Sequence, residues 1–264
     1  MTSTSPLAPT PEFLALCTGH GIAFDEGDVE RLGRYLSLLL DANTRFNLTA
    51  ITDPALGWTR HVFDSLTLMG PLAAVGAERV IDVGSGGGAP GIPLAICMPS
   101  VAFTLLEATT KKATFLRHAA TELGLDNVQV VNDRAETAGR GEASGRERFD
   151  AVVARAVGPL DVLLELTVPF ARVGGLVLAI KERRPRTRSP ARQALHRLHA
   201  TVIDSIRGPT GTLVVVEKRR PTPRARIPRS GRAEAPAAWP ARRLTGRGAG
   251  SQNADGRDKP GRRL

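Results

Sequence analysis

The sequence contains few cysteines and no long apolar run, and these absences exclude several classes of protein. Only two cysteines, Cys17 and Cys97, occur in 264 residues, and they lie far apart. We therefore expect neither a disulfide framework nor a metal site. No stretch approaches the ~18 consecutive apolar residues that a membrane-spanning helix needs, and the start of the chain, MTSTSPLAPTP, does not resemble a secretion signal. We expect a cytoplasmic protein without a membrane partner.

Positive charge is concentrated at the C-terminal end. Residues 219–264 contain 13 Lys and Arg against 3 Asp and Glu, so they hold the whole net charge of +10. Residues 221–264 are rich in Arg, Pro and Gly and poor in large apolar side chains, so we expect a disordered tail. A flexible basic arm suits a polyanion such as RNA, although a solvated tail without a partner has the same composition.

The N-terminal part predicts helices. Residues 1–11 show no pattern and are expected to be disordered, whereas residues 12–75 are expected to form a helical subdomain. Within it we expect a helix from Asp25 to about Arg45, capped by Asp25, and another over residues 53–69, capped by Asp53.

Residues 76–220 predict an α/β domain. Short apolar runs alternate with helical patterns, which is typical of a Rossmann-like, mostly parallel sheet with helices on both faces. Two late strands are joined by a short loop and must be antiparallel. The predicted strands are 79–83, 101–108, 128–132, 149–157, 175–181, 201–206 and 212–218, and the predicted helices are 91–98, 110–125, 160–173 and 191–200.

A glycine cluster follows the first predicted strand, in the stretch VIDVGSGGGAPGIP. A strand, a glycine loop and a helix together place a ligand at the helix N-terminus. The glycines match a dinucleotide-binding pattern, but such a match alone is weak. Asp82 at the strand end would face the ligand, repel a pyrophosphate and attract a cation such as the α-amino group of methionine. Pro90 removes an amide donor that a pyrophosphate would need.

These features favour S-adenosylmethionine, because the spacing of Asp82 and the glycines is typical of class I methyltransferases. Glu107 ends the next strand, where its carboxylate can accept the ribose hydroxyls; a helix cap or a partner of Lys111 is the alternative. Substitution of Gly86 by Val should close the site. The cofactor residues that follow from the pattern are Asp82, Gly84, Gly86, Gly88, Gly91 and Glu107.

The segment after the fourth strand limits the methyl acceptor. It reads ARAVGPL and lacks the Asn/Asp-Pro-Pro-aromatic motif of enzymes that methylate exocyclic amines. Neither cysteine follows a late strand, so a cysteine nucleophile for a pyrimidine carbon is not expected. An acceptor with its own lone pair remains, such as guanine N7, which needs alignment but no base. Arg155 ends this strand and could contact the cofactor, a guanine or a phosphate, unless it is a surface arginine.

Several motifs occur in an order that is similar to the ribosomal RNA small subunit methyltransferase G family, also called glucose-inhibited division protein B. They are FNLTAI, RHVFDSL, IDVGSGGGAPGIPLAI, TLLEATTKKATFLRHAATELGL, NDRAE, FDAVVARAV and GGLVLAIK. The resemblance covers about residues 12–230. It implies methyl transfer from S-adenosylmethionine to N7 of a guanine, with 16S rRNA or the small ribosomal subunit as partner. It also implies a methyltransferase fold with an N-terminal helical cap, and we expect a monomer.

The resemblance also implies individual contacts. Glu107 stands where the family more often has Asp, Ala89 where it has a bulkier apolar residue, and Glu182 where it has Gly. Arg155 is the candidate catalytic-site residue that positions substrate or cofactor. The cofactor contacts carried over from the family are Gly84, Ala89, Ala135, Glu136 and Arg155.

Two questions stay open at this point. Arg60, His61, Asp64 and Ser65 lie on one predicted helix, either as a packed surface or as a polar lip that receives the guanine. The chain could also be a non-catalytic RNA-binding or assembly module, or a methyltransferase for a protein or a small molecule.

Overall fold

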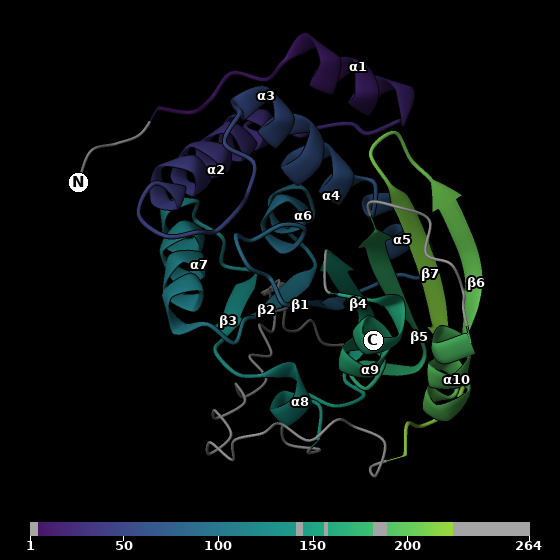
Figure 1. Cartoon of the computed structure of the whole chain (residues 1–264). Coiled ribbons are helices and arrows are strands. Elements are labelled where there is room, and N and C mark those ends of the chain that lie inside the picture. Colours follow the sequence, from purple (N-terminus) through teal and green to yellow (C-terminus); the bar gives the residue numbers. More distant parts are fainter. Residues whose placement is uncertain (1–4, 141–144, 156–157, 182–188, 224–264) are drawn as a thin grey trace, which may run out of the picture.

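The computed structural model describes residues 5–140, 145–155, 158–181 and 189–223. A seven-stranded sheet with the order β3-β2-β1-β4-β5-β7-β6 forms its centre (Figure 1). The pairs among β1 to β5 are parallel, whereas β7 is antiparallel to both β5 and β6, as the sequence predicts. The strands are β1 (Arg79–Val83), β2 (Ala102–Leu106), β3 (Val128–Val131), β4 (Phe149–Arg155), β5 (Ala171–Lys181), β6 (Ala200–Arg207) and β7 (Thr212–Lys218).

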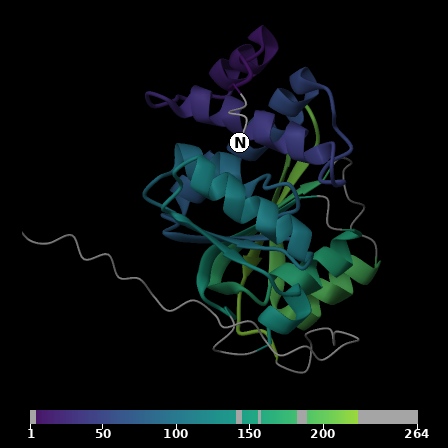
Figure 2. The same ribbon diagram turned by 90° about the vertical axis from the view of Figure 1, so that its left-hand side faces the viewer.

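Helices cover both faces of the sheet (Figures 1 and 2). One face carries α6 (Gly91–Cys97) and α7 (Thr110–Glu122), and the N-terminal helices lie over them; the other carries α8 (Ala135–Ala138), α9 (Leu160–Thr167) and α10 (Ser189–Leu198). No helix in the described ranges is long and apolar enough to cross a membrane. The N-terminal elements are α1 (Pro11–Gly19), α2 (Asp28–Asn43), α3 (Pro54–Gly57), the π-helical turn η1 (Trp58–Phe63), α4 (Asp64–Leu66) and α5 (Met69–Ala74).

The side chains of β1 alternate between two hydrophobic clusters, one on each face of the sheet. Val80 packs in the hydrophobic cluster on the α6 side, whereas Ile81 and Val83 pack in the cluster on the α9 side. Successive side chains of a strand point to opposite faces, so Asp82 shares the face of Val80. The carboxylate of Asp82 is thereby directed toward the start of α6.

Two predicted helix boundaries are wrong. Helix α2 begins at Asp28, and Asp25 does not cap it; instead the Asp28 carboxylate accepts a hydrogen bond from the Asp25 amide at 3.0 Å. Helix α9 ends at Thr167, and the chain already enters β5 at Ala171. Pro169 lies in the intervening turn, where it cannot donate a helical hydrogen bond.

Residues 5–10 are held against α2, although the sequence predicts disorder there. The Leu7 amide donates to the Gly33 carbonyl at 3.2 Å, and the Ser37 hydroxyl donates to the Ser5 carbonyl at 2.6 Å. A Cβ on Gly33 would lie 2.3 Å from the Leu7 carbonyl oxygen, so glycine permits this close approach. Leu7 also packs against the hydrophobic core, which offsets the entropy lost in fixing the segment.

The start of the predicted disordered tail is held by the domain. Thr222 is buried, and its amide donates to Glu147 Oε1 at 3.0 Å. The same oxygen accepts a hydrogen bond from the fully buried Lys218 Nζ at 2.8 Å. The boundary at residue 221 is therefore too early, while the prediction for 224–264 lies outside the described residues.

Candidate active site

The loop between β1 and α6 uses glycine for two different reasons. Gly84, Gly86 and Gly88 have φ angles of +75°, +55° and +99°, which glycine adopts without strain. A Cβ on Gly86 would meet nothing nearer than the Gly84 carbonyl oxygen at 3.8 Å. The loop is therefore open above Gly86, and this open surface is a cradle that a larger residue would fill.

The other glycines of the loop are close-packed. A Cβ on Gly88 would lie 2.6 Å from Ile92 Cδ1, and one on Gly91 would lie 2.3 Å from Leu105 Cδ2. Ala89 is also buried. Close packing, together with the positive φ of Gly88, accounts for both glycines without a ligand, so their cofactor contacts, like that of Ala89, stay predictions.

Asp82 is buried and bonded within the protein, and its contact with a cofactor stays a prediction. Its Oδ2 accepts a hydrogen bond from the Gly91 amide at 3.0 Å, and the residue is fully buried. Within the described part of the chain its Oδ1 has no hydrogen-bond partner. Burial raises the pKa of Asp82 to about 7, although the Gly91 bond and the charge of Arg155 act in the opposite direction.

The raised pKa of Asp82 predicts a pH-dependent contribution to stability. The folded protein binds this proton more tightly than the unfolded chain, so the contribution is largest below 3.8, the ordinary pKa of an aspartate, and is lost as the pH rises to about 7. The Asp82→Asn variant cannot titrate here. The difference in free energy of unfolding between the wild type and this variant is measured with urea at a series of pH values. We expect the wild type to lose stability relative to the variant between pH 3.8 and about 7, and the difference to stay constant above that. A constant difference would contradict the assignment.

Glu107 supports the glycine loop from the end of β2. Its Oε2 accepts a hydrogen bond from the Gly86 amide at 3.0 Å, and its Oε1 accepts one from the Thr109 amide at 2.7 Å, just before α7. Thr109 is the cap residue of α7, so Glu107 binds the amide of the cap residue and does not itself cap the helix. Each carboxylate oxygen can accept a further hydrogen bond, so the side chain is still able to bind ribose hydroxyls.

The segment after β3 lies beside this carboxylate. Asn132 Nδ2 donates to the Glu107 carbonyl at 2.9 Å, which joins the ends of β2 and β3. Ala135 and Glu136 follow at the start of α8 and are half-buried. The structure therefore brings this part of the predicted cofactor site to the same edge of the sheet as the glycine loop.

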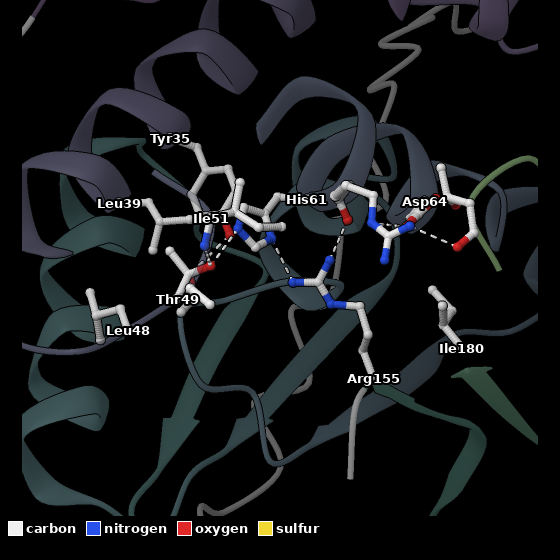
Figure 3. A pocket seen from close by; sticks show the side chains of 13 residues that line it. Tyr35, Leu39, Leu48, Thr49, Ile51, His61, Asp64, Arg155 and Ile180 are labelled. Carbon is white, nitrogen blue, oxygen red and sulfur yellow. Dashed lines mark hydrogen bonds and ion pairs between the residues drawn. The ribbon is translucent and has the colours of Figure 1, made fainter. Parts of the chain in front are cut away.

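Arg155 joins β4 to the N-terminal helical subdomain (Figure 3). Its Nη1 donates to the Arg60 carbonyl, and its Nη2 lies 2.6 Å from His61 Nδ1. The other ring nitrogen, His61 Nε2, lies 2.9 Å from Thr49 Oγ1. Arg155 is thus a member of a polar network and not a surface arginine.

A π-helical turn presents these groups. The predicted helix over 53–69 does begin with Asp53 as cap, since Asp53 Oδ1 accepts from the Ala55 amide at 2.7 Å. It widens at η1, however, where the Asp64 amide reaches back to the Thr59 carbonyl. Wide turns of this kind are frequent at functional sites. Here the turn carries both acceptors that meet Arg155, the Arg60 carbonyl and the His61 ring.

The same turn is tied to the loop between β6 and β7. Arg60 Nη1 donates to the Thr210 carbonyl at 2.8 Å, and the Thr210 hydroxyl donates to Asp64 Oδ1. The Arg60 and Asp64 side chains, which lie one helical turn apart, approach to 4.0 Å. Burial raises the pKa of Asp64. The buried Ser65 hydroxyl donates to the His61 carbonyl at 2.6 Å, one helical turn earlier.

His61 is a neutral side chain at ordinary pH. Burial lowers its pKa to about 3, and the positive charges of Arg155 and Arg60 act in the same direction. Both ring nitrogens have a polar neighbour within 3 Å. His61 therefore has no free lone pair with which to take a proton from a substrate.

A cavity of about 280 Å³ opens between the glycine loop and the helical subdomain (Figure 3). The Tyr35 hydroxyl donates to the Gly87 carbonyl at 2.9 Å and so fixes the loop at the cavity wall. Of the lining residues that were not predicted from the sequence, Thr49 lies in the FNLTAI motif, while Tyr35 and Thr210 gave no signal. The lining residues are Tyr35, Leu39, Leu48, Thr49, Ala50, Ile51, Arg60, His61, Asp64, Gly87, Arg155, Ile180 and Thr210.

The sheet order, the antiparallel β7 and the glycine loop after β1 define the class I methyltransferase fold. A solved structure, that of cofactor-bound Rv0187 from MTB, has this chain's fold with a TM-score of 0.52 and 22% sequence identity, covering 80% of this chain and 99% of that one.

Sequence comparisons identify the family. A family model, rRNA small subunit methyltransferase G, matches residues 28–209. The Ribosomal RNA small subunit methyltransferase G of Sorangium cellulosum is 45% identical, over 83% of this chain and 92% of the relative. The protein of the same name from Chloroflexus aggregans is 42% identical, over 81% and 91%. The chain belongs to the rRNA small subunit methyltransferase G family, and it is a methyltransferase.

Proposed function

We propose that the protein transfers a methyl group from S-adenosylmethionine to N7 of a guanine in 16S rRNA. The observation that carries this proposal is the cavity between Gly87 of the glycine loop and Arg155. The histidine in its wall, His61, is neutral and has no free lone pair with which to act as a base. Family membership supports ribosomal RNA as the substrate.

The glycine loop and its neighbours fit the proposed cofactor. The open surface above Gly86 leaves room for a ligand, and the Glu107 carboxylate beneath it suits ribose hydroxyls. S-adenosylmethionine, when bound, supplies a methyl group activated by a sulfonium. We propose that Gly84, Gly86 and Glu107 hold the cofactor, with Ala135 and Glu136 at its adenine. The buried Asp82 acts indirectly, because it holds the first amide of α6.

The chemistry of the cavity favours a ring nitrogen as acceptor. An exocyclic amine loses a proton when it is methylated and therefore benefits from a general base. Guanine N7 already carries a lone pair, so alignment and exclusion of water suffice. In the proposed reaction the residues of the cavity bind and orient the base, and none of them accepts a proton.

The proposed partner is 16S rRNA or the small ribosomal subunit, with the protein acting as a monomer in the cytoplasm. The charge distribution supports an RNA partner, because the whole net charge of +10 belongs to residues 219–264. Basic residues bind phosphates without reading sequence. We therefore propose that this segment adds affinity for RNA, while the cavity selects the base.

Chemical mapping of the methylated RNA tests the proposal. Small-subunit particles that lack this methyl group are incubated with the protein and S-adenosylmethionine, and the RNA is then treated with borohydride and aniline, which cleave at N7-methylguanine. We expect one new cleavage site in 16S rRNA. Methyl incorporation without cleavage would refute N7 as the acceptor. Incorporation that survives ribonuclease would instead indicate a protein or small-molecule acceptor.

A further inference from the structure

Thr49 places a hydroxyl group in the wall of the cavity. The residue is half-buried, and its Oγ1 lies 2.9 Å from His61 Nε2 and 3.0 Å from the Ile51 amide (Figure 3). The Thr49 amide and the neighbouring Leu48 amide both donate to Asn43 Oδ1, at 2.9 Å and 2.8 Å. The backbone at this point is therefore fixed, and the position of the hydroxyl oxygen with it.

The Arg155 side chain decides the direction of the hydrogen bonds that reach Thr49. A guanidinium group has donors and no acceptor, so His61 Nδ1, at 2.6 Å from Arg155 Nη2, must be the acceptor. A neutral imidazole carries its one proton on the other nitrogen. His61 Nε2 consequently donates to Thr49 Oγ1.

The Thr49 hydroxyl is left with only its donor function. A hydroxyl has two acceptor lone pairs and one proton, and the two lone pairs receive the His61 Nε2–H and the Ile51 N–H. Among the residues that the structure describes, no acceptor for the Thr49 proton is found. The proton is therefore available to a molecule in the cavity that Thr49 lines.

We propose that Thr49 selects guanine by donating a hydrogen bond to O6 of the acceptor base. On the edge of the purine that carries N7, guanine presents the acceptor O6, whereas adenine presents an amino donor at the same place. A hydroxyl that can only donate forms a hydrogen bond with guanine O6, whereas it meets another donor in adenine. In both cases it leaves the N7 lone pair free. His61 and Arg155 are positioning residues that act through Thr49. This inference rests on the proposed function.

The Thr49→Val variant removes the hydroxyl and keeps the shape of the side chain. We expect kcat/KM for small-subunit particles to fall by about tenfold to a hundredfold, the range expected when a buried acceptor, here guanine O6, loses its hydrogen bond. Thr49→Ser restores the donor and should lie within about threefold of the wild type. The matched control is Thr44→Val, because Thr44 is exposed and its hydroxyl bonds to the Asp41 carbonyl at 2.7 Å, outside the cavity.

A second measurement separates base selection from a structural role. Once the target is mapped, particles are prepared with adenine in place of that guanine, and the ratio of kcat/KM for guanine over adenine is determined. We expect Thr49→Val to lower this ratio at least tenfold and Thr44→Val to leave it unchanged. If Thr49→Val does not fold, as judged by thermal unfolding, Thr49→Ala replaces it.

Three results would overturn the inference: a Thr49→Val variant as active as Thr44→Val, a Thr49→Ser variant as impaired as Thr49→Val, or an unchanged guanine-to-adenine ratio in Thr49→Val. Each of these leaves methylation by the wild type intact. Failure of the proposed function is different, because the wild type itself would then produce no N7-methylguanine in the particles.

Discussion

Replacement of Arg155 by Met should reduce methyl transfer at least a hundredfold while the protein stays folded. The methionine fills a similar space but donates to neither the Arg60 carbonyl nor His61 Nδ1. The tautomer of His61 is then no longer fixed, and η1 loses its connection to the end of β4. The expected loss combines the unfixed Thr49 donor with a displacement of η1 at the cavity, and a misplacement of about 1 Å in an active site can by itself lower the rate about a hundredfold.

The Arg155→Met variant should also be less stable than the wild type, because two acceptors lose their partner at about 1–3 kcal/mol each. The desolvation cost of burying the arginine disappears and offsets part of this loss. Rates are therefore compared below the unfolding temperature of the variant. Single-turnover methyl transfer to small-subunit particles and thermal unfolding measure the two quantities. Arg197→Met, whose parent side chain pairs with Glu165 on the α9–α10 surface, is the control. Activity above half of wild type in Arg155→Met would disprove the positioning role.

Substitution of Gly86 by Val should abolish cofactor binding. The new side chain would occupy the open surface above the loop, and its backbone would be strained at a φ of +55°. A left-handed conformation costs a non-glycine residue about 1–2 kcal/mol. We expect calorimetry with S-adenosylmethionine to show at least a hundredfold weaker binding, since the valine displaces the ligand itself.

Gly76 provides a matched control for this strain. Its φ is +56°, and a Cβ there would meet nothing within 4 Å. Gly76 precedes β1, whereas the glycine loop follows it, so the two glycines lie at opposite ends of this strand. Gly76→Val should therefore suffer the same backbone strain and still bind the cofactor. Loss of binding in both variants would indicate unfolding rather than a blocked site. Wild-type affinity in Gly86→Val would refute the placement of the cofactor on this loop.

The centre of the sheet could be predicted from the sequence because its strands β1 and β4 are buried on both faces. Continuous apolar runs such as RVIDV and FDAVVAR, separated by helical patterns, are typical of strands in a parallel sheet that is covered by helices on both faces. The short connection over residues 208–211 requires the last two strands to be antiparallel. The error at β5 arose because the end of α9 and the start of the strand form one apolar run, LDVLLELTVPFARV. Periodicity alone cannot separate a helix from a strand in such a run.

The site was only partly predictable for a different reason. The glycine loop, Glu107 and Arg155 could be predicted because a strand end places its residues at a known edge of the sheet. The inward turn of Asp82 depends on the position of α6, and the role of Thr49 depends on a chain of contacts through His61 to Arg155. These residues are far apart in sequence, and no local pattern specifies which nitrogen of a histidine carries the proton.

The π-helical turn also sets the rotational phase of the helix that carries the site. A regular α-helix advances about 100° per residue, so a turn that takes up one extra residue rotates its two flanks relative to each other by about that angle. Trp58 before the middle of the turn and Leu66 beyond it are both buried. An uninterrupted helix would direct one of these flanks away from the core. The irregular turn thus lets a single helix bury Trp58 and Leu66 on one side and still present Arg60 and His61 to the methyltransferase domain.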